Sequence, residues 1–275
     1  MTETDTDTDT DTDTDTDKDK SDKSLVTTPW PEIVQRVRAR TPARLLAGRS
    51  GAAYRTGTQL DLRAAHAAAR DSVRAELDLQ AAFEPDFVKQ WELFEVRTRA
   101  TSKQEYLLRP DLGRHFDDAA EKELLQRCTA KCDFQIMIGD GLSVSAVAAQ
   151  VPALLPLLFA GARERGWTVG QPFVVHHCRV GILNEIGALL APQVAVLLIG
   201  ERPGLATAES LSAYMAYQPR ENHSDADRNL ISNIHARGVN PNHASVRILN
   251  LAAQIMKTGS SGCNLKEALP PLAKE

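Results

Sequence analysis

The stretch Phe134-Gln135-Ile136-Met137-Ile138-Gly139-Asp140-Gly141-Leu142-Ser143 decides the fold of this chain. Its first five residues form a largely apolar run that suits a strand buried on both faces, and the glycines after it indicate a tight turn. Residues 144–165 then predict a helix, bent at Pro152 and Pro156. This order of strand, loop and helix is typical of α/β proteins.

Further strands and helices follow in the same order. Residues 173–175 predict a second strand, and the nearly all-aliphatic residues 194–199 predict a third, with a helix at 182–190 between them. An amphipathic helix at 243–257 closes the unit. Because such runs are buried on both faces, we predict an α/β fold whose C-terminal part is an open, mostly parallel, Rossmann-like sheet flanked by helices.

Composition divides the 275 residues into three parts. Residues 1–24 contain a seven-fold Thr-Asp repeat and carry ten acidic side chains against three lysines, which predicts a disordered, acidic tail of net charge −7. Residues 25–105 predict a smaller, mostly helical region, with helices at 33–37 and 58–77. Residues 106–275 form the predicted α/β domain.

Charge and hydropathy exclude several classes of partner. The whole chain has a net charge of −4, so everything after the tail carries only +3, too little to neutralise a phosphate backbone, and nucleic acid is not expected as a partner. The longest apolar stretches, 144–161 and 182–199, are interrupted by prolines or charges, so no membrane span is expected. Because the N-terminus lacks the apolar run of a signal peptide, we expect a cytoplasmic protein.

Two carboxylates mark the predicted ligand site. Asp140 and Glu201 each follow a predicted strand directly and are flanked by glycines. Ligands of open parallel sheets bind outside the carboxyl ends of the strands, where carboxylates accept hydrogen bonds from ligand amides or hydroxyls. A purely structural alternative is that Asp140 and Ser143 cap the next helix while Glu201 pairs with Arg202. No glycine-rich phosphate-binding motif is found.

Three other features are weaker candidates. Residues 227–235 mix polar and apolar side chains without a clean period, which predicts a partly buried loop able to line a ligand site. His176 and His177 point to opposite faces of a strand, so no metal site is expected. Cys178 and Cys263 lack the local signature of a catalytic thiol, and G-x-S-x-G is missing, so the signal for hydrolysis is weak.

Four ordered motifs carry a family resemblance: Arg109-Pro110-Asp111-Leu112-Gly113-Arg114, Asp140-Gly141-Leu142-Ser143, Gly200-Glu201-Arg202-Pro203-Gly204-Leu205 with Glu209-Ser210-Leu211-Ser212, and Asp227-Arg228 through Ile231-Ser232-Asn233-Ile234-His235. In this order the chain resembles the small (light) subunit of ethanolamine ammonia-lyase. The resemblance runs from about residue 41 to residue 262.

The resemblance implies an adenosylcobalamin-dependent enzyme of large and small subunits that converts ethanolamine to acetaldehyde and ammonia. Homolysis of the cobalt–carbon bond would generate a 5′-deoxyadenosyl radical, which takes a hydrogen from the substrate before the amino group is lost. In the family the substrate sits in a barrel of the large subunit. This chain is therefore expected to clamp the cobalamin at the subunit interface, with no catalytic residue or metal ligand of its own.

Carried over by motif, the cobalamin-contacting positions of the family fall on Val180 in Cys178-Arg179-Val180, on Glu201 and on Leu230. Corrin amides are hydrogen-bond donors that Glu201 can accept, while Val180 and Leu230 offer backbone groups and apolar contact. Some members have cysteine at the position of Leu230. In this chain the contact with the cofactor is therefore expected through the main chain or the apolar side chain, because the thiol is missing. The D-x-H-x-x-G pattern of proteins that ligate cobalt through histidine is missing, and the cofactor is expected to keep its own base.

Two alternatives and one question of location stay open. The first alternative to a lyase subunit is a stand-alone α/β module that binds a nucleotide-like small ligand, and the second is an independent hydrolase. Both would work without a partner subunit. Family members in protein-shelled compartments use an amphipathic N-terminal segment, which Thr-Asp repeats cannot form. A location within a bacterial microcompartment is therefore neither implied nor excluded.

Overall fold

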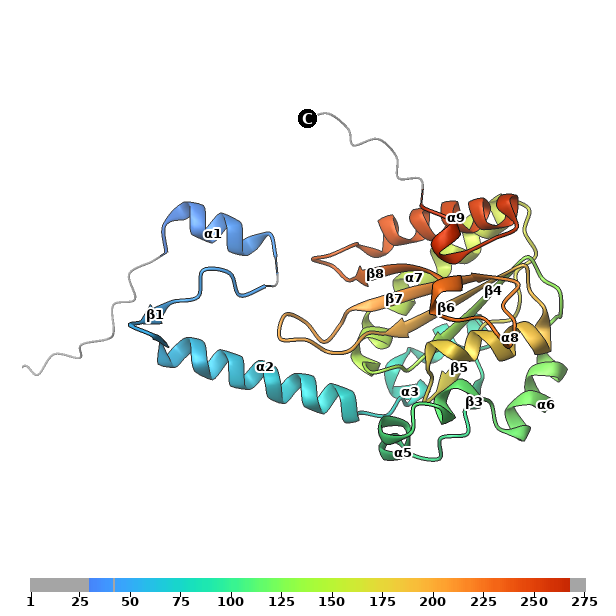
Figure 1. The fold of residues 1–275 in the computed structure, drawn as a ribbon, viewed down its shortest axis with the longest axis horizontal. Coiled ribbons are helices and arrows are strands. Elements are labelled where there is room, and N and C mark those ends of the chain that lie inside the picture. Colours follow the sequence, from blue (N-terminus) through green and yellow to red (C-terminus); the bar gives the residue numbers. More distant parts are fainter. Residues whose placement is uncertain (1–29, 42, 268–275) are drawn as a thin grey trace, which may run out of the picture.

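The computed structural model describes residues 30–41 and 43–267 and has a six-stranded sheet at its centre (Figure 1). The strand order is β3-β5-β4-β6-β7-β8; the first four strands run parallel, and β6, β7 and β8 alternate in direction. The strands are β3 (Glu95–Arg97), β4 (Phe134–Gly139), β5 (Phe173–His176), β6 (Val194–Gly200), β7 (Leu211–Tyr217) and β8 (Asn229–Ile234). The predicted α/β class is confirmed with a mixed sheet, and the Rossmann-like relationship stays a prediction.

Two layers of helices cover the sheet. The long helices α7 (Val144–Glu164) and α9 (Pro241–Thr258) pack on one face, and α6 (Asp118–Arg127) and α8 (Leu183–Leu190) pack on the other. Successive side chains of β4 and β6 enter these two cores in turn, because strand side chains alternate between faces. Both strands are buried along their whole length, as their aliphatic sequences predict.

Helix α7 is the one helix of the described chain that is long and apolar enough to cross a membrane. Ten of its residues are buried, and it packs against the sheet and against α9, as the core helix of a globular domain does. Helix α7 is continuous through both Pro152 and Pro156.

The N-terminal part is mostly helical. It contains α1 (Glu32–Ala39) and α2 (Thr56–Arg74), which confirm the two predicted helices and reach away from the sheet (Figure 1). A short hairpin joins them, and two short helices precede the first strand of the sheet; these elements are β1 (Arg49–Ser50), β2 (Ala53–Tyr54), α3 (Leu79–Ala82) and α4 (Pro85–Gln90). Strand β3 also belongs to this stretch. The predicted acidic tail lies outside the described residues.

The antiparallel end of the sheet differs from the sequence prediction. Residues 227–235 were expected to form a loop, but β8 lies within them, and β7 was not expected. The pairing of β7 with β8 shifts register between Leu211 and Ala213, and Asn233 has a left-handed backbone with φ of 61°. Such irregularities interrupt the two-residue alternation by which a half-buried strand is identified.

Candidate functional site

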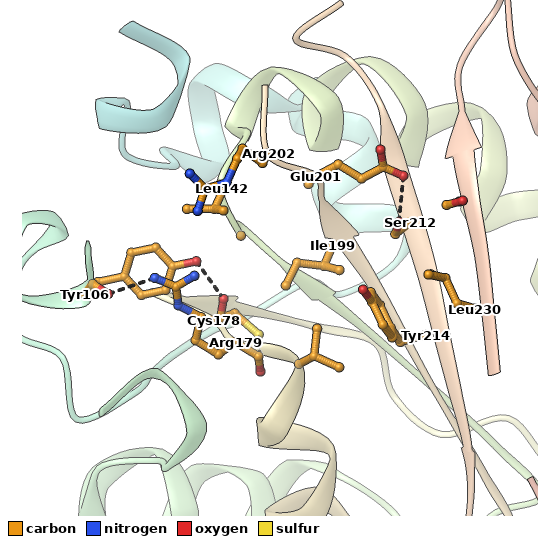
Figure 2. Close-up of a pocket in the computed structure, with 14 residues that line it drawn as sticks. Tyr106, Leu142, Cys178, Arg179, Ile199, Glu201, Arg202, Ser212, Tyr214 and Leu230 are labelled. Carbon is orange, nitrogen blue, oxygen red and sulfur yellow. Dashed lines mark hydrogen bonds between the residues drawn. The ribbon is translucent and has the colours of Figure 1, made fainter. Parts of the chain in front are cut away.

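A cavity of about 290 Å³ lies at the carboxyl ends of β4 and β6 (Figure 2). This is the edge at which the sequence predicts ligand binding, and segments far apart in the chain meet there. The walls are formed by Tyr106, Gly141, Leu142, Cys178, Arg179, Val180, Ile199, Gly200, Glu201, Arg202, Ser212, Tyr214, Leu230 and Ser232.

The three residues assigned from the family resemblance all line this cavity. Val180 begins a short 3-10 helix (Val180–Ile182) after β5, Glu201 directly follows β6, and Leu230 lies on β8. The side chain of Leu230 is exposed, because β8 is the edge strand of the sheet. The fold therefore brings together three positions that are separated by up to fifty residues in sequence.

Glu201 is held by its neighbours through one carboxylate oxygen. Its Oε1 accepts a hydrogen bond from Ser212 Oγ at 2.7 Å (Figure 2) and another from the backbone N–H of Asn233 at 2.8 Å. Its Oε2 accepts no hydrogen bond from the described residues. The alternative of an ion pair with Arg202 is wrong, since the carboxylate bonds to β7 and β8 instead. A fixed acceptor with one oxygen left over suits a ligand that donates N–H groups.

Asp140 does not face a ligand. Its side chain is fully buried and accepts hydrogen bonds from the backbone N–H groups of His177 at 2.9 Å and Cys178 at 2.8 Å, with Lys103 Nζ at 3.5 Å. The expectation that both carboxylates serve a ligand is therefore wrong for Asp140. The alternative that Asp140 caps α7 is also wrong. Ser143 does cap this helix, because its Oγ accepts a hydrogen bond from the N–H of Ala146.

Asp140 and Lys103 instead hold the loop after β5. His177 has a left-handed backbone with φ of 55°, and the two bonds to Asp140 fix this turn just before Val180. Lys103 is buried as well and donates to the carbonyl of Gly141 at 3.1 Å. A buried carboxylate is stable only when it is paired and hydrogen-bonded, and here both conditions hold.

Helix α5 (Lys103–Leu108) contributes a wall that sequence reasoning missed. Tyr106 is fully buried and donates its hydroxyl to the carbonyl of Cys178 at 3.0 Å, and burial raises its pKa above the ordinary value of 10.0. Arg179 stacks on the Tyr106 ring with its guanidinium 4.0 Å from the ring centroid. Its Nε is buried without a partner among the described residues. No local pattern marks these residues, because only the fold brings α5 to this edge.

The remaining candidates have structural roles. His176 Nε2 lies 2.8 Å from Glu95 Oε1, and His177 Nδ1 lies 2.9 Å from the carbonyl of Ala100. Cys178 is fully buried, and burial raises its pKa well above the ordinary thiol value. Because the thiolate is the nucleophile, this environment disfavours hydrolysis through Cys178.

Comparison with known proteins gives one consistent family. Residues 31–266 match the family model described as ethanolamine ammonia-lyase light chain (EutC). Proteins named ethanolamine ammonia-lyase small subunit are 41% identical in Clostridium perfringens, 39% in Fusobacterium nucleatum and 40% in Listeria monocytogenes. The matches cover 84–86% of this chain and 76–78% of those proteins. The chain therefore belongs to the ethanolamine ammonia-lyase light-chain family and is a subunit of that lyase.

Proposed function

We propose that this chain clamps adenosylcobalamin against a large catalytic subunit, which carries out the conversion of ethanolamine to acetaldehyde and ammonia. The observation that carries the proposal is the convergence of Val180, Glu201 and Leu230 on one cavity at the carboxyl edge of the sheet (Figure 2). When bound, the cofactor supplies the radical chemistry of the reaction. The residues of this chain bind and orient it.

The polar groups of the cavity fit the rim of a corrin, whose side-chain amides present both N–H donors and C=O acceptors. Among the described residues neither Glu201 Oε2 nor the buried Arg179 Nε has a hydrogen-bond partner, so the first could accept from an amide N–H and the second could donate to an amide carbonyl. The side chains of Leu142, Ile199 and Leu230 supply apolar walls. An apolar cavity with a few fixed polar groups is the usual form of a cofactor site.

Leu230 fits this role through its side chain. It is 45% exposed on β8 and lines the cavity, so it offers apolar contact where other members carry a cysteine. Val180 begins a short 3-10 helix and also lines the cavity. Both residues therefore add apolar surface to the cavity that Glu201 lines.

The size of the cavity supports a shared site. About 290 Å³ is at the lower limit of the roughly 300–1,000 Å³ found for drug-sized ligands, and a corrinoid with its nucleotide tail is larger than these. Leu230, which lines the cavity, is 45% exposed and leaves apolar surface uncovered there. A large subunit that covers this surface would complete the site, whereas a stand-alone module for a small nucleotide-like ligand would enclose its ligand unaided. The assembly is proposed to work in the cytoplasm.

Co-expression with a candidate large subunit tests the proposal. We expect acetaldehyde to form from ethanolamine only with the complex plus adenosylcobalamin, and not with either subunit alone. Failure of two folded subunits to form a complex or to react would favour the stand-alone module. Saturable binding of a small ligand by this chain alone would identify that module directly.

A further inference from the structure

A second cavity, of about 670 Å³, adjoins the first. The two share segments of the chain: Val180 lines the first and Gly181 the second, and at the start of β8 Leu230 lines the first while Arg228 lines the second. Neighbouring residues of the same two segments therefore line both cavities. The lining of the second cavity is strongly polar, and it consists of Arg99, Arg114, His115, Gly181, Asn184, Glu185, Ala188, Glu221, His223, Ser224, Asp225 and Arg228.

Arg228 is fixed in this cavity with an unused donor. Its side chain is only 4% exposed, and its guanidinium bonds to Asp225 through Nη1 and to Asn184 Oδ1 at 2.9 Å through Nη2. Its Nε, and likewise Nδ1 of His223, is buried without a hydrogen-bond partner in the described part of the chain. Buried polar atoms of this kind are rare in folded proteins and point to a missing ligand or water.

Arg114 contributes a second guanidinium. Its aliphatic stem lies across Gly181, where an added Cβ would come within 2.8 Å of Arg114 Cγ, so the missing side chain there makes room for the arginine. Among the ion pairs of the described residues, none involves Arg114. Burial lowers the pKa of Arg228, and the positive charge of Arg114, which lines the same cavity, lowers it further.

The acidic groups of the cavity compensate Arg228 through Asp225 but leave Arg114 without an ion pair among the described residues. Glu185 lies 2.6 Å from His115 Nδ1 and also accepts from the N–H of Phe116, and Asp225 pairs with Arg228. Glu221 is exposed at the rim. An oxyanion between Arg114 and Arg228 would satisfy the unpartnered Nε and remove the repulsion, and arginine is the preferred side chain for phosphate.

We propose that this second cavity binds a phosphate group, namely the phosphodiester of the nucleotide tail of the corrinoid that occupies the first cavity. The inference rests on the proposed function, because the position of the second cavity beside Val180 makes the tail of the same ligand the nearest source of phosphate. A free phosphate ester is the other source with the same chemistry. The experiment separates the two.

The test compares two corrinoids on the assembled complex of this chain with its large subunit. Adenosylcobalamin carries the nucleotide tail, and adenosylcobinamide lacks it. We expect Arg114→Gln to weaken adenosylcobalamin binding, measured by equilibrium dialysis, on the order of tenfold while leaving adenosylcobinamide binding unchanged. Arg114→Glu should weaken it further. Arg109→Gln, at an exposed arginine outside both cavities, is the matched control and should change neither affinity.

Each outcome bears on a separate claim. If Arg114→Gln changes the affinity of both corrinoids equally, or of neither, the tail does not bind here. If inorganic phosphate binds the wild-type complex through Arg114 while the two corrinoids bind alike, the cavity serves a free phosphate ester and the proposal is overturned. If neither corrinoid binds the wild-type complex, the proposed function itself fails. Because Arg114 is exposed, these variants are expected to fold, which circular dichroism checks.

Discussion

At the scale of a single residue, Glu201 is the contact that the proposed function needs most. Glu201→Ala should weaken adenosylcobalamin binding to the complex by about 1–3 kcal/mol, because a ligand donor is then buried unpaired. Glu201→Gln keeps the oxygen that Ser212 and Asn233 bind but places an NH2 donor where Oε2 would accept from the ligand, so it should lose about as much. Glu209→Ala, at an exposed glutamate of the same loop, is the control. Equal affinity of all four proteins would remove Glu201 from the site.

The buried pair of Asp140 and Lys103 should matter for stability rather than for direct contact with the cofactor. Asp140→Ala leaves Lys103 and two backbone N–H groups unpaired, so it should lower the free energy of unfolding by about 3–5 kcal/mol in urea titrations. The double variant with Lys103→Met should lose less than the sum of the single variants. Asp111→Ala, in an exposed ion pair, is the control and should leave the unfolding curve nearly unchanged. Additive losses would refute the coupling.

Tyr106 should make stability depend on pH in alkaline solution. The native state retains the phenolic proton because burial raises its pKa, whereas the unfolded chain releases it above about pH 10. Stability should therefore fall as pH rises beyond 10, by up to about 1.4 kcal/mol per pH unit from this group. Tyr106→Phe loses one hydrogen bond at neutral pH, but its deficit should shrink above pH 10. Urea unfolding at pH 8 and at about pH 10.5 measures this, with Tyr54→Phe at an exposed position as control. A deficit that is constant with pH would contradict the prediction.

At the scale of the elements, the site depends on the close crossing of two loops. The loop from β4 to α7 and the end of β6 meet so closely that a Cβ on Gly200 would lie 2.0 Å from the carbonyl oxygen of Ser143, and one on Gly141 would lie 2.4 Å from that of Gly200. Gly141 also has a positive φ of 57°, a conformation that side chains other than glycine rarely adopt. The floor of the first cavity is therefore set by two glycines.

Gly200→Ala tests this crossing. It should lower the free energy of unfolding by about 1–3 kcal/mol, because backbone atoms must shift to admit the methyl group. Gly57→Ala is the matched control: Gly57 lies in α2 with open space around it, so alanine should raise stability by up to about 1 kcal/mol. Chemical denaturation of both variants gives the comparison. The same response from both would show that the crossing is not tight.

At the scale of the whole molecule, the acidic segment should be dispensable for folding. Residues 2–24 contribute no apolar side chain, so their deletion should leave the urea unfolding curve and the activity of the complex unchanged. Deletion moves the formal net charge from −4 to +3, and the isoelectric point should rise above its value of about 6.0. Isoelectric focusing and denaturation measure the two effects. A loss of stability would show that the segment packs on the folded chain.

Much of the architecture was predictable because its signals are local. The apolar runs of β4 and β6, the helix after the first and the amphipathic α9 follow from hydrophobic period and turn residues. The structure confirms each of them. Strand β8 was not predictable in this way, since a register shift and the left-handed Asn233 disturb its alternation. Strand β7 lacks a clean period because most of its residues are buried on both faces.

The sequence by itself determined the α/β class and, through its motifs, the family, and it predicted the edge of the sheet at which Glu201 and the first cavity lie. Only the tertiary structure decided that Asp140 turns inward onto backbone N–H groups, that Tyr106 and Arg179 form a wall, and that Arg114 and Arg228 line one cavity. The physical reason is the range of the interactions. Period, turn chemistry and motifs are encoded among neighbours in sequence, whereas the partner of a buried charge is set by which distant segments the packed core brings together.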